Sequence, residues 1–102
     1  MLTHEQIVEA VKNAAPKYGI SNAYYFGSYA RGTQNENSDL DLLVDFDKLS
    51  VSLWATVDLA ESISKTLKIK VDVLKLPLPT DTRLYIEKVV KCYGNKRQTH
   101  TG

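Results

Sequence analysis

The sequence predicts an α/β protein with a small mixed β-sheet of three or four strands and helices mainly on one face of that sheet. Short apolar runs at residues 22–26, 39–45 and 70–76 have the length and composition of strands. Other segments carry apolar residues at three- and four-residue spacing, as amphipathic helices do. A chain of 102 residues is the size of one domain.

The first element is expected to be a helix that begins after Thr3. Thr3 and Gln6 resemble a capping box, in which each side chain bonds to the other residue's backbone. Four apolar residues then follow helical spacing: Ile7, Val8, Val11 and Ala14. Pro16 should kink this helix or restart a final turn, and Gly19 should end it.

Residues 22–26 form the first predicted strand, which stops at Gly27-Ser28. A short helix is expected over residues 28–31, and the polar residues 33–38 form a turn. The second strand is predicted over residues 39–45, and it is almost entirely apolar after two acids at its start.

Ser50 is the candidate N-cap of a third helix. Its predicted apolar face consists of Leu53, Val57, Ala60, Ser64 and Leu67. Trp54 beside this face is expected to lie in the core or to face a partner. The third strand covers residues 70–76, and a last helix is predicted over residues 81–92. The domain is assigned to residues 1–94, and residues 95–102 are expected to be a disordered tail.

The start of the second strand carries the pattern Asp39-Leu40-Asp41, ten residues after Gly27-Ser28. Alternate residues on a strand point to one face, so Asp39 and Asp41 should project together. Neighbouring carboxylates repel each other unless a cation lies between them, and a hard divalent ion such as Mg²⁺ prefers oxygen ligands. Gly27 lets an anion approach the backbone, and the amides near Ser28 can donate to phosphate oxygens. A plain turn and a strand-edge acid are the simpler interpretation of each motif alone, but their combination favours a nucleotide site.

Asp72 interrupts the third apolar run, with Val71 and Val73 facing one way and Asp72 the other. A buried acid is costly unless it is paired or bound to metal. An edge strand with Asp72 in water explains the residues equally well, so the strand pattern alone leaves both readings open.

The segments FGSYARG (residues 26–32) and SDLDLLV (residues 38–44) resemble the nucleotidyltransferase superfamily related to DNA polymerase β. More narrowly, the chain is similar to the minimal nucleotidyltransferase (MNT) proteins of bacteria and archaea. The resemblance covers about residues 1–93. The pattern of Gly-Ser, ten residues and Asp-x-Asp is matched without a gap. Tyr29 departs from it, because many relatives have Arg at this position.

The resemblance implies a polymerase β-like fold and a metal-dependent transfer of AMP from ATP to a hydroxyl group. It implies that Asp39, Asp41 and Asp72 are catalytic and bind two Mg²⁺ ions, or Mn²⁺ in their place. Gly27, Ser28 and Arg31 would bind the nucleotide. The implied partner is a HEPN protein, an all-α RNase toxin with a tyrosine as acceptor, and this chain would be its antitoxin.

Two other functions remain open from the sequence. The first is an antitoxin that neutralises its partner by contact alone, and the second is a subunit that modifies a small molecule. The intact set of three acids argues against the first, because mutually repelling acids have no physical reason to persist in a relic site.

Composition excludes several other classes. The formal net charge is +1, from 13 basic and 12 acidic side chains, which gives no general signal for nucleic-acid or membrane binding. Cys92 is the only cysteine, so no internal disulfide is possible. No apolar stretch is long enough to span a membrane, and the N-terminus lacks the apolar run of a signal peptide. The expected compartment is the cytoplasm.

Overall fold

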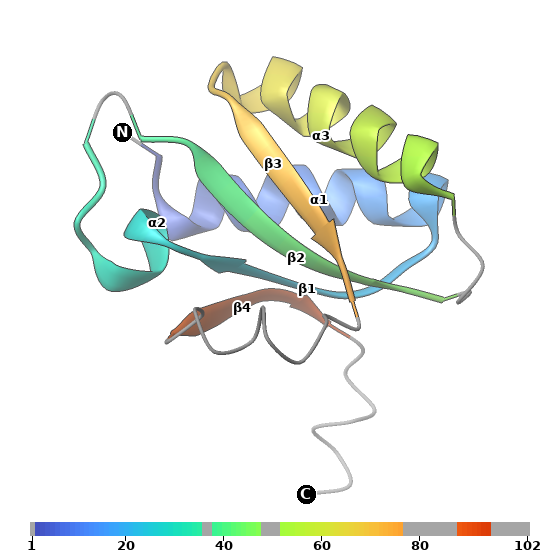
Figure 1. The fold of residues 1–102 in the computed structure, drawn as a ribbon, viewed down its shortest axis with the longest axis horizontal. Coiled ribbons are helices and arrows are strands. Elements are labelled where there is room, and N and C mark those ends of the chain that lie inside the picture. Colours follow the sequence, from blue (N-terminus) through green and yellow to red (C-terminus); the bar gives the residue numbers. More distant parts are fainter. Residues whose placement is uncertain (1, 36–37, 48–51, 77–87, 95–102) are drawn as a thin grey trace, which may run out of the picture.

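A computed structural model describes residues 2–35, 38–47, 52–76 and 88–94 of the chain. It shows one four-stranded sheet with the two long helices on the same face (Figure 1). The elements in chain order are α1 (His4–Tyr18), β1 (Ile20–Phe26), α2 (Ser28–Arg31), β2 (Leu40–Phe46), α3 (Leu53–Leu67), β3 (Val71–Lys75) and β4 (Val89–Gly94). The predicted α/β class, with helices mainly on one face of a mixed sheet of three or four strands, is therefore confirmed.

The strands lie in the order β3-β2-β1-β4. β1 pairs antiparallel with both β2 and β4, whereas β2 and β3 are parallel. The parallel pair is joined through α3, because a parallel connection needs a crossover. This topology places the C-terminal end of β1 beside the N-terminal ends of β2 and β3, and the motif residues lie at that edge of the sheet.

Helix α1 begins and ends as the sequence predicts. The Thr3 side chain accepts a hydrogen bond from the Gln6 amide, and the Gln6 side chain accepts one from the Thr3 amide, so the capping box is present. Gly19 closes the helix in the left-handed conformation with φ 68°. Pro16 lies in the last turn, and the helix continues through it to Tyr18. Five residues of α1 are buried against the sheet: Ile7, Ala10, Val11, Ala14 and Ala15.

Helix α3 differs from its prediction in both start and orientation. Its N-cap is Ser52, and Ser50 lies outside the described residues. The buried residues are Thr56, Leu59 and Ile63, whereas Leu53 is 76% exposed. The predicted apolar face is therefore correct only in part: Ala60 and Leu67 pack against the core, but Leu53 and Val57 are exposed and the buried residues are ones that the prediction did not include. Both sets of residues have helical spacing, and packing on α1 and β3 selects the one that includes the large side chains of Leu59 and Ile63.

The prediction of a last helix over residues 81–92 is wrong for its C-terminal part. Val89–Gly94 forms β4, which pairs antiparallel with β1, and residues 81–87 lie outside the described part of the chain. β-branched valines fit a strand well, and the open edge of β1 supplies the ladder partner that no local pattern reveals. The predicted tail, residues 95–102, also lies outside the described residues.

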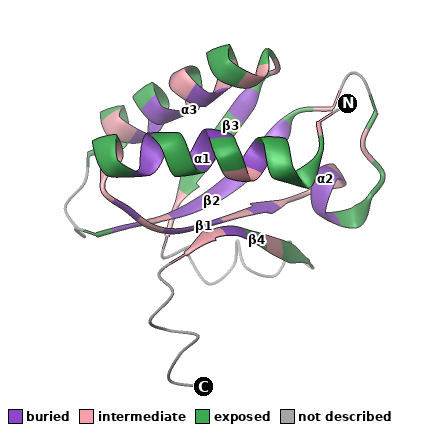
Figure 2. Cartoon of the chain, turned by 180° about the vertical axis from the view of Figure 1, so that it is seen from behind, coloured by how far each residue is buried: buried purple, intermediate pink, exposed green. Residues whose placement is uncertain are grey.

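The core lies between the helices and one face of the sheet (Figure 2). Alternate residues of β2 point into it, and Leu40 and Leu42 are completely buried there. The intervening residue, Asp41, faces the opposite side, which α1 and α3 do not cover. We call that side the open face. None of the described helices is both long and apolar enough to cross a membrane.

Candidate active site

Three adjacent strands bring Phe26, Asp41 and Asp72 into one row on the open face. Phe26 of β1 is the register partner of Asp41 in β2, and Asp41 is the register partner of Asp72 in β3. Register partners in neighbouring strands share a face of the sheet. The structure thus brings together two of the three predicted acids, which lie 31 positions apart in the chain.

The backbone of Gly27 lies against the carboxylate of Asp41. A methyl group built on the Gly27 Cα would lie 2.6 Å from Asp41 Oδ2, which is closer than real atoms of this kind approach. Gly27 has φ 74° and ψ −146°, a backbone conformation that side-chain-bearing residues rarely adopt. Two features therefore require glycine at position 27: the backbone conformation and the lack of space for a side chain.

The short helix α2 follows Gly27 directly. The amides of Ala30 and Arg31 both donate to the Gly27 carbonyl at 3.1 Å. Within the described part of the chain, the preceding amides of Ser28 and Tyr29 have no backbone acceptor. These amides and the Ser28 hydroxyl directly follow Gly27, whose backbone lies against Asp41. They can donate hydrogen bonds to an anion.

Tyr29 and Arg31 leave α2 in different surroundings. The Tyr29 side chain is 7% exposed and belongs to the hydrophobic core, so this position is structural here. Arg31 is exposed, and its charge acts on Asp41. Of the two, only Arg31 has a charged group available to a ligand.

The electrostatics of the site centre on Asp41. Burial raises the pKa of the Asp41 carboxyl above its ordinary value, and the negative charges of Asp72 and Asp39 raise this pKa further. The Arg31 guanidinium acts in the opposite direction and lowers it. The site therefore carries an excess of negative charge around a half-buried carboxylate, and a bound cation would relieve it.

Asp39 lies just outside the strand on which it was predicted. β2 begins at Leu40, and Asp39 precedes it as an exposed residue. Among the described residues, no three His, Cys, Asp or Glu side chains form a group that could hold a metal ion as they stand. The charges of Asp39 and Asp72 reach Asp41, but the three acids do not form one group of ligands.

The donor set nevertheless fits a hard divalent cation. Carboxylate oxygens are the preferred ligands of Mg²⁺, and Asp41 and Asp72 present them from the same row of the sheet. Gly27 keeps the space beside Asp41 Oδ2 free of side-chain atoms.

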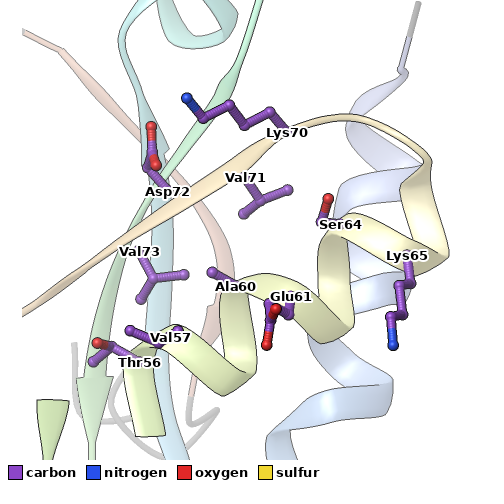
Figure 3. A pocket seen from close by; sticks show the side chains of 10 residues that line it. All are labelled: Thr56, Val57, Ala60, Glu61, Ser64, Lys65, Lys70, Val71, Asp72 and Val73. Carbon is purple, nitrogen blue, oxygen red and sulfur yellow. The ribbon is translucent and has the colours of Figure 1, made fainter. Parts of the chain in front are cut away.

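A groove of about 490 Å³ lies next to this row, between α3 and β3 (Figure 3). The lining residues are Thr56, Val57, Ala60, Glu61, Ser64 and Lys65 of α3, together with residues 70–73 of the β3 region. Asp72 belongs to this lining, whereas Gly27, Ser28 and Asp41 do not. The acid-bearing row is thus adjacent to the groove rather than inside it.

Sequence reasoning missed this groove, although one signal for it was present. The helical spacing places Val57, Ala60 and Ser64 on one face of α3, as predicted. In the structure they form the flank of α3 that lines the groove. Exposed apolar residues at helical spacing can mark a binding surface as well as a core.

The sequence model of the nucleotidyltransferase domain family matches residues 4–99 of the chain. Among curated relatives, protein adenylyltransferase MntA of Thermococcus cleftensis is 36% identical over 78 residues, which are 72% of this chain and 78% of that protein. A Methanocaldococcus jannaschii protein, provisionally named a protein adenylyltransferase, is 40% identical over 63 residues, which are 62% of this chain and 63% of the relative. The match therefore spans somewhat less than two thirds of the length of that relative.

Solved structures share the fold. A crystal structure of a toxin-antitoxin with AMP-PNP contains a chain that aligns with a TM-score of 0.74 and 24% identity, covering 98% of this chain and 80% of the other. A structure of tri-AMPylated Shewanella oneidensis HEPN toxin in complex with MNT antitoxin aligns with a TM-score of 0.64 and 18% identity, covering 96% and 75%. At these identities the structural similarity establishes the fold. The match of the family model to nearly the whole sequence goes further, and the chain belongs to the nucleotidyltransferase domain family.

Proposed function

We propose that this protein transfers AMP from ATP to a hydroxyl group of a partner protein. The observation that carries the proposal is the Gly27 backbone held against the Asp41 carboxylate, with Asp72 in the same row of the sheet. This arrangement would put the proposed phosphate donors beside the proposed metal-binding acids. Membership of the nucleotidyltransferase family and the name of the MntA relative support AMP transfer to protein.

The nucleotide would be held at the start of α2. The amides of Ser28 and Tyr29 and the Ser28 hydroxyl would donate to the terminal phosphates, and Arg31 would add positive charge. Because Gly27 has no side chain, a phosphate oxygen could approach the backbone amides that follow it at the start of α2. These donors would fix the triphosphate so that the α-phosphorus faces the acids.

Asp39, Asp41 and Asp72 would hold two Mg²⁺ ions, with Mn²⁺ as the alternative. When bound, Mg²⁺ supplies positive charge that stabilises the attacking oxygen and the pyrophosphate leaving group. Asp72 would also accept the proton of the acceptor hydroxyl. The acceptor oxygen then bonds to the α-phosphorus, the bond from the α-phosphorus to the bridging oxygen breaks, and pyrophosphate leaves.

The acceptor we propose is a tyrosine of a HEPN-family toxin, with this chain as the antitoxin. Related folds occur in complexes of an MNT antitoxin with a HEPN toxin that carries AMP groups, and in a toxin-antitoxin with AMP-PNP. Asp72 lies on the exposed side of β3, where a second chain can reach it. The open row of acids thus suits a macromolecular acceptor.

Two measurements test the proposal. Calorimetry should show ATP binding that requires Mg²⁺ and is weakened in Asp41→Asn. The matched control is Asp45→Asn, which removes an acid from the same face of the same strand, four residues from Asp41. Asp45 accepts a hydrogen bond from Asn22 and is not part of the proposed site. Incubation with ATP, Mg²⁺ and a HEPN-family toxin should add AMP to that toxin, read by intact-mass spectrometry. If this protein neutralises the toxin without any increase in the toxin's mass, and Asp41→Asn neutralises it equally well, the protein is instead an antitoxin that acts by contact alone.

A further inference from the structure

A lysine lies directly before β3, at the edge of the sheet that carries the proposed site. The Lys70 carbonyl accepts a hydrogen bond of 3.0 Å from the Leu40 amide, which fixes the backbone of Lys70 against β2. Leu40 is the register partner of Val71. One residue earlier on each chain segment, the same parallel register places Lys70 next to Asp39. A positive charge is therefore attached beside the first of the three acids.

The Lys70 side chain lies on the open face of the sheet. Lys70 and Asp72 are two residues apart, and alternate residues of an extended chain point to one side. Figure 3 shows their side chains on one side of β3 and those of Val71 and Val73 on the other. Val71 is 6% exposed and packs in the core, whereas Lys70 and Asp72 are exposed. The Lys70 ammonium thus shares the face that carries the acids.

Lys70 and Arg31 approach these acids from opposite sides. Arg31 ends α2, which follows β1, whereas Lys70 precedes β3. Because β2 lies between them, β1 and β3 are two strand spacings apart, roughly 9–10 Å. The terminal phosphates of ATP are proposed to lie on the β1 side, at the start of α2. Lys70 is then placed for a different group, the α-phosphate, which faces the acids of β2 and β3.

The other lysine of the neighbouring groove is not equivalent. Lys65 and Lys70 both line the groove between α3 and β3. Figure 3 shows that Lys65 points away from β3, so that the two lysine side chains diverge. Lys65 therefore provides a matched control, since it has the same charge and borders the same groove but does not point toward the acids.

We propose that Lys70 is a catalytic residue that holds the α-phosphate of ATP from the β3 side of the site. Its ammonium group would donate hydrogen bonds to a non-bridging oxygen of this phosphate and would keep its proton throughout the transfer. A fixed cation at that position stabilises the phosphoryl oxygens while the acceptor oxygen bonds and pyrophosphate leaves. This inference rests on the proposed function. It assigns Lys70 to the α-phosphate and leaves Arg31 with the terminal phosphates.

Two ligands separate these phosphate positions without any transfer reaction. AMP carries only the α-phosphate, and pyrophosphate represents the terminal pair. Calorimetry with Mg²⁺ present should show that Lys70→Met weakens AMP binding at least about fivefold, as expected for one lost charge-assisted hydrogen bond. Pyrophosphate binding should be nearly unchanged in this variant. Arg31→Met should have the reverse effect, and Lys65→Met should change neither affinity.

The choice of substitution excludes an effect on folding. Methionine keeps the length and the apolar stem of the lysine side chain and removes its charge. Because Lys70 is exposed, the melting temperature of Lys70→Met should be nearly unchanged. Loss of a positive charge beside the acids should leave Mg²⁺ affinity unchanged or raise it. Lys70→Arg, which keeps the charge, should retain most of the AMP affinity. A lower melting temperature with no difference between the two ligands would mark Lys70 as structural and overturn the inference.

Transfer assays separate this inference from the proposed function. With a HEPN-family toxin as acceptor, Lys70→Met should lower the rate of AMP transfer at least about tenfold, and Lys65→Met should keep the wild-type rate. If the wild-type protein transfers AMP and Lys70→Met binds AMP equally well, the inference is wrong and the function stands. A raised KM for the toxin in that variant would then indicate a contact with the acceptor instead. If the wild-type protein transfers nothing while AMP binding still depends on Lys70, the function is wrong and the phosphate contact stands.

Discussion

The two faces of the central strand β2 serve different purposes with alternate residues. Toward the helices, Leu40, Leu42 and Val44 are at most 1% exposed and form the centre of the core. Toward the open face, Asp41 is half-buried beside Gly27 and carries a raised pKa. Of two adjacent residues, one thus stabilises the fold by burial and the other destabilises it by charge repulsion. Because side chains alternate along a strand, residues packed in the rigid core can hold mutually repelling acids in place on the opposite face, only one residue away in the chain.

Asp72→Asn tests the functional side of this comparison with the largest expected effect. AMP transfer should fall by about 10³-fold or more, because the residue would hold metal and accept the proton. The melting temperature should stay nearly unchanged or rise, since the exposed Asp72 adds negative charge next to Asp41. Transfer rates and thermal unfolding of the same preparation check both. A strongly destabilised variant would show that Asp72 is a structural acid.

Leu42→Ala tests the structural side. Removal of this completely buried side chain should lower the free energy of unfolding by about 2–5 kcal/mol, from lost burial and the cavity left behind. Urea denaturation measures the loss. Leu74→Ala is the matched control, because Leu74 is 38% exposed and should cost well under half as much. Below the midpoint of unfolding, the ATP affinity of folded Leu42→Ala should equal that of the wild type; a large loss of affinity would show that the two faces are not separable.

Gly27→Ala should affect both the stability of the fold and the binding of ATP. The backbone conformation at φ 74° should cost about 1–3 kcal/mol for alanine, and the new methyl group must displace the Asp41 carboxylate. Gly32→Ala is the matched control, because Gly32 also has a positive φ of 75° but nothing lies within 4 Å of the added atom. Metal-dependent ATP binding should be lost only in Gly27→Ala. Equal ATP affinity in the two variants would remove Gly27 from the site.

The pH dependence of stability should show a smaller effect of the same repulsion. The pKa of Asp41 is raised in the folded protein, so the stability that it contributes is fully present below the ordinary value of 3.8 and is lost as the pH rises through the folded value. Asp41→Asn should therefore be more stable than the wild type at pH 7, by about 1 kcal/mol or less, and the difference should vanish in acid. Thermal unfolding between pH 3 and pH 7 measures it. Added Mg²⁺ should reduce the difference; a wild type that is the more stable protein at pH 7 without metal would contradict the assigned repulsion.

Local patterns predicted those parts of the molecule whose signals are complete within a few residues. The capping pair Thr3 and Gln6 and the terminating Gly19 define α1, because caps involve only neighbouring backbone groups. The alternation of Val71, Asp72 and Val73 correctly predicted that the two valines share one face of the strand and Asp72 lies on the other, because the period of a strand is a local property. The combination of Gly27-Ser28 with the two acids predicted one site; the structure brings Gly27 against Asp41, whereas Asp39 lies just outside β2.

Long-range packing decided the rest. Helix α3 contains two sets of residues with helical spacing, and only contact with α1 and β3 selects Leu59 and Ile63 as the buried set. The valines at positions 89 and 90 suit a helix or a strand, and the free edge of β1 makes them a strand. The closeness of Asp41 and Asp72, and the groove beside Val73, depend on the register between β2 and β3.

The sequence by itself thus determined the type of most elements and the ends of α1, because these depend on residues near one another in the chain. Only the tertiary structure decided the rotation of α3, the strand identity of Val89–Gly94 and the strand order in which β3 follows β2. The physical reason is that burial and strand pairing are properties of surfaces that meet across long stretches of chain. A local sequence pattern can be compatible with several packing arrangements, and the free energy of packing the whole domain selects one of them.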